Sequence, residues 1–174
     1  MEIEKKYTLK YLPEPLSDYR KIEIEQGYLL REPTVRVRKA NDRYILTIKE
    51  IPQDVSEEAQ EEACIRREEE FFLSEEAYRT LLAKCDGVIL SKTRYLIPLS
   101  GENAGLTVEL DVFHGYLSGL FFAEVEFPDE ERARSFRAPD WFDQDVSADY
   151  HYRNGYLSSL EPGEPLWYDN GKSL

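Results

Sequence analysis

Apolar and charged residues alternate along much of this chain. In the run Val35-Arg36-Val37-Arg38 the valines and arginines each recur at a period of two, which in an extended strand sends them to opposite faces. Similar runs, bounded by proline, glycine or Asn-Asp turn signals, recur through the sequence and are typical of β-strands. We predict strands at residues 1–11, 22–30, 34–39, 43–49, 64–73, 88–99, 106–113 and 120–127.

Helical patterns are few and short. Ser74 precedes two glutamates and can cap a helix that runs to about Lys84, because a serine side chain accepts hydrogen bonds from the free N–H groups at a helix start. The acidic residues 52–62 predict a solvated loop, and the tail from about residue 162 is expected to be loosely held. The other expected elements are a short helix at 129–136, a turn at 139–142 and an amphipathic stretch at 149–160.

The composition indicates one soluble domain. A chain of 174 residues, 41% of them apolar, can bury a core, and no repeat or linker divides it, so we take 1–174 as a single domain. The net charge of −13 disfavours nucleic acid and anionic membranes as partners. We expect a cytoplasmic protein, because neither a basic-then-apolar leader nor an apolar run of about 18 residues is visible. The two cysteines lack metal-like spacing, and the two histidines pair with no plausible nucleophile.

Charged residues of one sign occur in pairs two positions apart, as in Glu2 and Glu4 or Arg36 and Arg38. Each pair alone fits an exposed sheet face with cross-strand ion pairs, and that interpretation stays open. Together, however, acids and bases segregate by strand, whereas a solubilising surface usually mixes them. The acids of this face are Glu2, Glu4, Glu68, Glu70, Glu109, Asp111, Glu124 and Glu126, and its bases are Lys6, Arg36, Arg38, Lys49, Lys92 and Arg94.

A closed barrel would satisfy both faces of these strands. We therefore predict an α+β, mainly β, fold: an eight-stranded antiparallel β-barrel forming a tunnel, with charges in the lumen and helices packed outside against the apolar face. Eight strands leave room for side chains and one small ligand. Uncompensated buried charges cost several kcal/mol each, so the lumen must be wet or hold a ligand. Six bases favour a polyanion, and clustered carboxylates without cysteine or histidine favour Mg²⁺ or Mn²⁺. A metal-bound polyphosphate meets both demands.

The ordered motifs resemble those of the CYTH, or triphosphate tunnel metalloenzyme, superfamily over roughly residues 2–160. The opening Glu2-Ile3-Glu4-Lys5-Lys6 matches its E-x-E-x-K signature, and the close matches in Tyr152-x-Asn154. Between them lie Gln26-Gly27-Tyr28-Leu29, Val35-Arg36-Val37-Arg38, Leu46-Thr47-Ile48-Lys49, Arg66-x-Glu68-x-Glu70, Lys92-Thr93-Arg94-Tyr95, Glu109-Leu110-Asp111-Val112-Phe113 and Ala123-Glu124-Val125-Glu126-Phe127. The resemblance implies a tunnel that binds triphosphates with divalent metal, and among members the chain looks most like compact bacterial tripolyphosphatases.

The resemblance also implies roles for individual residues. The chain departs from the pattern at His151, where many relatives carry a base, and in an acidic segment (52–62) that looks longer than in the shortest relatives. Lys49, Lys92 and Arg38 are the candidate catalytic residues, although the two lysines could act only as electrostatic clamps. The implied metal ligands are Glu2, Glu4, Glu109, Asp111, Glu124 and Glu126, and the implied phosphate-binding residues are Lys6, Arg36, Arg38, Lys49, Lys92 and Arg94.

These features predict metal-dependent hydrolysis of a triphosphate, foremost inorganic tripolyphosphate to pyrophosphate and phosphate. A class IV-type adenylate cyclase, a thiamine triphosphatase and a non-catalytic binder of polyphosphate or nucleotides remain alternatives, because specificity depends on residues at the rim of the tunnel and not on the fold. The expected partner is a small-molecule triphosphate, with no nucleic acid and no membrane, and a homodimer is left open.

Overall fold

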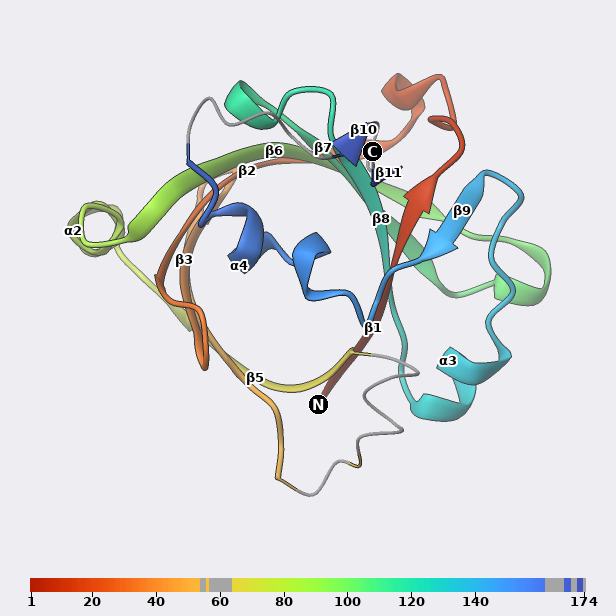
Figure 1. Ribbon diagram of the computed structural model, residues 1–174, viewed down its shortest axis with the longest axis horizontal. Coiled ribbons are helices and arrows are strands. Elements are labelled where there is room, and N and C mark those ends of the chain that lie inside the picture. The colour runs from red at the N-terminus through yellow and green to blue at the C-terminus, as the bar shows by residue number, and fades with distance from the viewer. Residues whose placement is uncertain (54–55, 57–63, 162–167, 170–171, 174) are drawn as a thin grey trace.

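Eight antiparallel strands close into a barrel in the computed structural model, which describes residues 1–53, 56, 64–161, 168–169 and 172–173. Neighbours around the barrel follow the order β5-β4-β3-β2-β6-β7-β8-β1, and pairing of β1 with β5 (Glu2 opposite Arg66) completes the ring. Figure 1 looks along this ring. The strands are β1 (Glu2–Leu9), β2 (Arg20–Leu30), β3 (Thr34–Ala40), β4 (Arg43–Glu50), β5 (Cys64–Phe72), β6 (Asp86–Pro98), β7 (Thr107–Phe113) and β8 (Phe121–Glu126).

The predicted fold class is therefore confirmed, and each of the eight strands lies within two residues of its predicted bounds. A ninth strand, β9 (Phe142–Asp145), extends the sheet from the end of β1; it begins at the last residue of the turn predicted at 139–142, and no strand was predicted there. The remaining elements are α2 (Glu75–Leu82), α3 (Glu130–Ser135), α4 (Asn154–Leu157), the 3₁₀ turns η1 (Leu16–Asp18), η2 (Gly101–Asn103), η3 (Gly115–Leu117) and η4 (Tyr150–Tyr152), and the short strands β10 (Tyr168–Asp169) and β11 (Lys172–Ser173).

The outer face of β1, β7 and β8 carries the first hydrophobic core. Val108, Leu110 and Val125 are fully buried there, and they alternate along their strands with the carboxylates of the inner face. Phe136, which follows α3, and Phe142 of β9 pack over this face against Tyr7, with ring centroids 6.0 and 4.7 Å from the tyrosine ring. The expected outside placement of helices holds for α3.

Helix α2 covers the outer face of β2, β3 and β4. Ser74 caps the helix as predicted, accepting a hydrogen bond from the N–H of Ala77 at 3.1 Å. Tyr78 is buried against Tyr44, and its hydroxyl donates to Glu25 at 2.9 Å. Within the described part of the chain no helix is long and apolar enough to cross a membrane. Most of the predicted acidic loop at 52–62 and of the predicted loose tail lies outside the described residues.

The C-terminal elements η4 and α4 differ from the expected outside cover, because they lie within the ring of strands (Figure 1). We call residues 150–159 the closing segment. Tyr152 packs edge-on against Phe122 of the inner face at 5.4 Å, and its carbonyl accepts a hydrogen bond from the Lys6 ammonium at 2.8 Å. A second core fills this end of the lumen, formed by Tyr28, Leu90, Phe113, Leu117, Leu120, Phe122, Val146, Tyr152 and Leu157. The lumen is therefore apolar at one end and charged in the remainder.

Gly87 fixes the closing segment to the start of β6. The Ser158 carbonyl accepts a hydrogen bond from the N–H of Val88 at 2.7 Å, and a Cβ added at Gly87 would lie 2.2 Å from that carbonyl oxygen. Gly87 also has a φ of +78°, a conformation that strains residues with a side chain. This position therefore requires glycine for two separate reasons.

We predict that Gly87→Ala lowers the free energy of unfolding by about 1–3 kcal/mol more than a matched substitution without the clash. Gly101→Ala is that control, because Gly101 has a φ of +64° and nothing within 4 Å of the added Cβ, so it bears only the backbone strain of about 1–2 kcal/mol. Urea denaturation of both variants measures the difference. Equal losses would show that contact with the closing segment does not constrain Gly87.

Candidate active site

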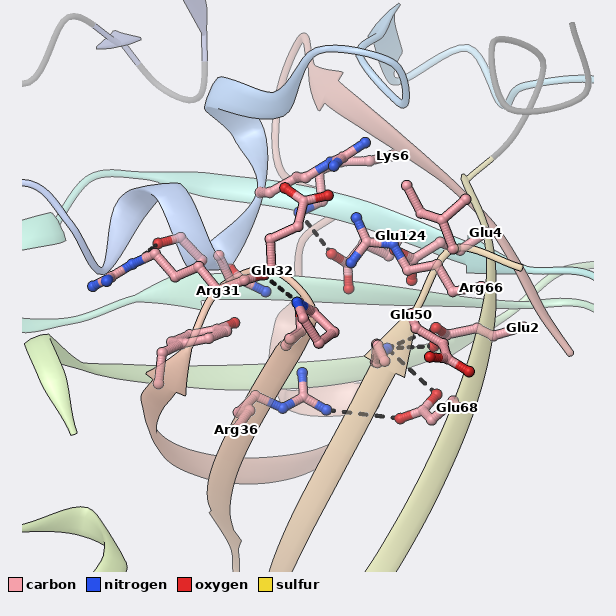
Figure 2. A pocket seen from close by; sticks show the side chains of 18 of the residues that line it. Glu2, Glu4, Lys6, Arg31, Glu32, Arg36, Glu50, Arg66, Glu68 and Glu124 are labelled. Carbon is pink, nitrogen blue, oxygen red and sulfur yellow. Dashed lines mark hydrogen bonds and ion pairs between the residues drawn. The ribbon is translucent and has the colours of Figure 1, made fainter. Parts of the chain in front are cut away.

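A cavity of about 980 Å³ occupies the charged part of the lumen. Side chains from all of β1, β3, β4, β5, β6, β7 and β8 line it, together with the end of β2 and the closing segment; Figure 2 shows them converging from the surrounding strands. Its carboxylates are Glu2, Glu4, Glu32, Glu50, Glu68, Glu70, Glu109, Glu124 and Glu126, and its bases are Lys6, Arg31, Arg36, Arg38, Lys49, Arg66, Arg94 and Arg153. The charged face predicted from the period of two is therefore an inner face and not a solvated one.

On the side of β4 and β5, Lys49 joins two acidic strands. Its ammonium lies 2.7 Å from both carboxylate oxygens of Glu2 and 3.3 Å from Glu68. Arg36 donates to the Thr47 hydroxyl at 3.2 Å and reaches Glu68 only at 3.8 Å. Figure 2 marks the contact between Arg36 and Glu68 with a dashed line. The guanidinium of Arg36 therefore keeps donors available to a ligand.

On the opposite side, Glu124 holds two bases. Lys6 lies 2.7 Å from one of its oxygens and Arg94 lies 2.7 Å from the other. Burial alone would raise the pKa of Glu124, but Lys6 and Arg94 hold that pKa well below its usual value. Glu124 is therefore ionised and serves to hold the two bases in place.

Lys92 and Asp111 lie behind the wall of the cavity. Their side chains are 0% and 2% exposed, and the Lys92 ammonium donates to Asp111. Arg94 donates to the same carboxylate through Nε at 2.6 Å and through a terminal nitrogen at 2.7 Å, and it also pairs with Glu109. Burial lowers the pKa of Lys92 to about 8, whereas Arg94 and Lys92 overcome the effect of burial and lower the pKa of Asp111. This buried triad orients the Arg94 guanidinium.

Arg38 differs from its neighbours because its guanidinium forms no ion pair with any described residue, and its buried Nε has no hydrogen-bond partner there. Burial, Arg36 and Arg94 together lower the pKa of Arg38 to about 10, so the arginine remains charged at neutral pH. Buried polar groups in folded proteins nearly always have a partner. An unpartnered cation beside two further arginines indicates a place for an anion.

Carboxylates predominate in another part of the cavity. No described cation lies within ion-pair distance of Glu4, and burial and the Glu124 charge raise its pKa. The pKa of Glu126 is likewise raised by burial and by Glu2 and Glu109. Burial raises the pKa of Glu2 and of Glu109. In all four, neighbouring carboxylates add to the effect of burial on the pKa, so negative charge is concentrated in this part of the lumen.

This concentration of carboxylates fits a divalent metal in charge and in ligand type, since hard carboxylate oxygens suit Mg²⁺ and Mn²⁺. Among the described residues no group of three or more His, Cys, Asp or Glu side chains already converges at metal-binding spacing. Glu2, Glu109 and Glu124 are instead paired with Lys49 or Arg94. Glu4 and Glu126 are the carboxylates best placed to accept a metal without breaking an ion pair.

The structure thus brings nearly all of the predicted site residues to one cavity. Lys92 and Asp111 are the two placed behind its wall, and every assigned role remains a prediction. Sequence reasoning missed Tyr28, Arg31 and Arg153 as lining residues. Tyr28 and Arg153 belong to motifs that the sequence shares with the CYTH pattern. Neither is part of a pair of like charges two positions apart, which is the pattern that identified most of the other lining residues.

Comparison with known proteins agrees with this geometry. The chain is 32% identical over 165 residues to the inorganic triphosphatase of Nitrosomonas europaea, covering 92% of this chain and 99% of that protein. It is 34% identical over 135 residues to the inorganic triphosphatase of Acetivibrio thermocellus, covering 76% of this chain and 77% of that protein. No protein-family model matches the sequence.

Solved structures give the same result. The crystal structure of the inorganic triphosphatase NE1496 matches with a TM-score of 0.65 and 31% identity, covering 94% of this chain and 97% of that one. The PH1012 protein of Pyrococcus horikoshii OT3, at 22% identity and a TM-score of 0.53, shares the fold. The chain therefore belongs to the CYTH, or triphosphate tunnel metalloenzyme, superfamily, in the family of the bacterial inorganic triphosphatases.

Proposed function

We propose that this protein is a divalent-metal-dependent inorganic triphosphatase that hydrolyses tripolyphosphate to pyrophosphate and phosphate. The observation that carries the proposal is the unpartnered Arg38 guanidinium, which lies beside Arg36 and Arg94 in a cavity that also contains clustered carboxylates. A polyanion with a bound cation complements both parts. The names of the relatives support the same substrate, and we further expect the enzyme to act in the cytoplasm.

In this proposal the arginines bind the substrate. A guanidinium presents a planar fork of N–H donors that matches two phosphoryl oxygens, a geometry that lysine lacks. Arg38 has no partner to give up, and Arg36 holds Glu68 only at 3.8 Å. Both can therefore turn to phosphoryl oxygens at low cost, whereas Lys6 and Arg94 approach the substrate as parts of ion pairs with Glu124.

The chemical step transfers the terminal phosphoryl group to water. The water oxygen forms a bond to phosphorus as the bond to the bridging oxygen breaks, and pyrophosphate leaves with its developing negative charge. Arg38, with Arg36 and Arg94, would stabilise charge on the non-bridging oxygens in the transition state. Lys49 lines the cavity and is our candidate to neutralise or protonate the leaving group, while the buried Lys92 acts through Asp111 and Arg94.

The metal would be held by Glu4 and Glu126, with Glu2, Glu109 and Glu124 as the adjoining carboxylates. A divalent ion bound there would neutralise substrate charge and polarise a phosphoryl oxygen.

The test is a substrate panel. We predict that purified protein releases phosphate from tripolyphosphate much faster than from ATP or thiamine triphosphate, that EDTA stops turnover, and that Mg²⁺ or Mn²⁺ restores it. Pyrophosphate and cyclic AMP from ATP would instead identify a cyclase, and preference for thiamine triphosphate a thiamine triphosphatase. Binding of intact tripolyphosphate without turnover under every metal would refute the hydrolase and leave a binding module.

A further inference from the structure

The buried side-chain atoms that lack a hydrogen-bond partner in the described chain gather around one place. Four of the five belong to residues that line the tunnel cavity. Two of these are Arg36 and Arg38 on β3, and the other two are Arg153 and Asn154 on the closing segment. The full set comprises Gln26 Oε1, Arg36 Nε, Arg38 Nε, Arg153 Nε and Asn154 Oδ1. The closing segment, like β3, therefore presents buried polar atoms near the cavity that have no hydrogen-bond partner in the described chain.

Arg153 is the one base that the closing segment brings to the cavity. Its guanidinium forms no ion pair with a carboxylate of the described chain, and its Nε is buried without a partner. The carboxylates that could neutralise it are engaged elsewhere, Glu124 by Lys6 and Arg94 and Glu2 by Lys49. Since no described carboxylate pairs with Arg153, an anionic ligand bound in the cavity would complement its charge.

The backbone on both sides of Arg153 is fixed. The Tyr152 carbonyl accepts from Lys6 at 2.8 Å, and the Gly155 carbonyl accepts from Arg31 Nε at 3.0 Å. Arg31 is itself held by Asp86, with 2.7 Å between its guanidinium and the carboxylate. An arginine on a fixed backbone loses less conformational freedom when it binds a ligand. Its orphaned nitrogen is thus a prepared donor and not a mobile surface group.

His151, two residues earlier, does not share this position. Its Nδ1 lies 2.7 Å from an Asp149 oxygen, and its ring lies 3.9 Å from that of Tyr150. Arg153 occupies the variable position of the Tyr152-x-Asn154 motif. The basic side chain that meets the cavity from this segment is therefore Arg153.

We propose that Arg153 is a further phosphate-binding residue, which donates from its guanidinium to non-bridging oxygens of the bound triphosphate. The inference rests on the proposed function, because it takes the triphosphate as the occupant of the cavity. It adds a contact from the closing segment to those of the strands, so that the substrate is bound from two elements far apart in the sequence.

The test measures steady-state hydrolysis of tripolyphosphate and, by calorimetry, the Kd of pyrophosphate with Mg²⁺. Loss of a charge-assisted hydrogen bond predicts that Arg153→Ala raises KM and this Kd about ten- to a hundred-fold, with a smaller change in kcat. Arg153→Gln, which keeps the stem, should match Arg153→Ala, and Arg153→Lys should recover part of the loss. Arg137→Ala is the control, since Arg137 is exposed and should leave both constants unchanged.

The outcomes separate the two proposals. Hydrolysis by the wild type with KM and Kd unchanged in both Arg153→Ala and Arg153→Gln would overturn the role of Arg153 and leave the proposed function intact. A loss confined to kcat and thermal stability, without rescue by lysine, would also overturn it, because that pattern shows a structural residue. A wild type that neither hydrolyses nor binds these phosphates would overturn both.

Discussion

Replacing Arg38 by alanine should lower kcat/KM for tripolyphosphate by about 10²–10³, the usual loss when one preorganised donor to a transition state is removed. The same substitution should leave the free energy of unfolding unchanged or raise it. Arg38 forms no ion pair among the described residues, and its pKa is lowered by burial and by Arg36 and Arg94, so its charge destabilises the folded protein. Because Arg38 lowers the free energy of unfolding and forms no ion pair in the described chain, its presence is best explained by a functional role.

The two halves of this prediction need separate measurements. Initial rates with tripolyphosphate give the catalytic loss, and urea denaturation gives the stability change. Lys39→Ala is the matched control, because Lys39 is the next residue on β3 and faces outward, where its ammonium lies 6.0 Å from the Tyr44 ring. Full activity in Arg38→Ala, or a clear loss of stability, would contradict an anion-binding role.

The strands and the inner charge face could be predicted because both are local properties. A period of two assigns each residue to a face, and the runs around Arg36 and Glu109 are bounded by clear turn signals. Segregation of acids and bases by strand then favoured a lumen over a surface. The structure agrees, since Glu68 faces Lys49 and Glu124 faces Lys6 across neighbouring strands.

The closing segment could not be predicted in the same way. Its apolar residues Tyr152 and Leu157 fit an amphipathic stretch on either surface of a barrel, and only tertiary packing decides which. Leu90 and Phe122 also stand on the charge-bearing face of their strands, so the lumen changes from charged to apolar part way along. The closing segment packs inside the barrel because this apolar part of the lumen accepts its apolar side chains.

The sequence pattern also did not predict which charged side chains of the inner face pair with one another and which line the cavity. Lys92 and Arg94 look alike in the sequence, as do Glu109 and Asp111, yet only one of each pair lines the cavity. Which side chain reaches the cavity depends on the stagger and tilt of neighbouring strands, which local alternation does not specify. Asp111, predicted as a metal ligand, is accordingly found between two cations.

Asp111 provides the second large effect, and its sign is opposite to that of Arg38 for stability. Asp111→Asn should lower the free energy of unfolding by about 3–5 kcal/mol, the cost of leaving buried charge without its partner. The carboxylate is 2% exposed and holds both Lys92 and Arg94. Asparagine keeps the volume and removes the charge, so the loss reports the ion pairs and not a cavity.

Urea denaturation of Asp111→Asn beside Asp140→Asn measures this cost, since Asp140 is exposed and its substitution should change stability by less than about 0.5 kcal/mol. Activity should also fall in Asp111→Asn, because one of the two oxygens that accept from Arg94 is replaced by an NH2 group and the charge that orients the guanidinium is lost. A stable Asp111→Asn protein that has lost only its metal dependence would contradict the structural role and restore Asp111 as a metal ligand. Arg38 and Asp111 therefore distinguish the residues of one charged lumen that meet the substrate from those that hold the wall in place.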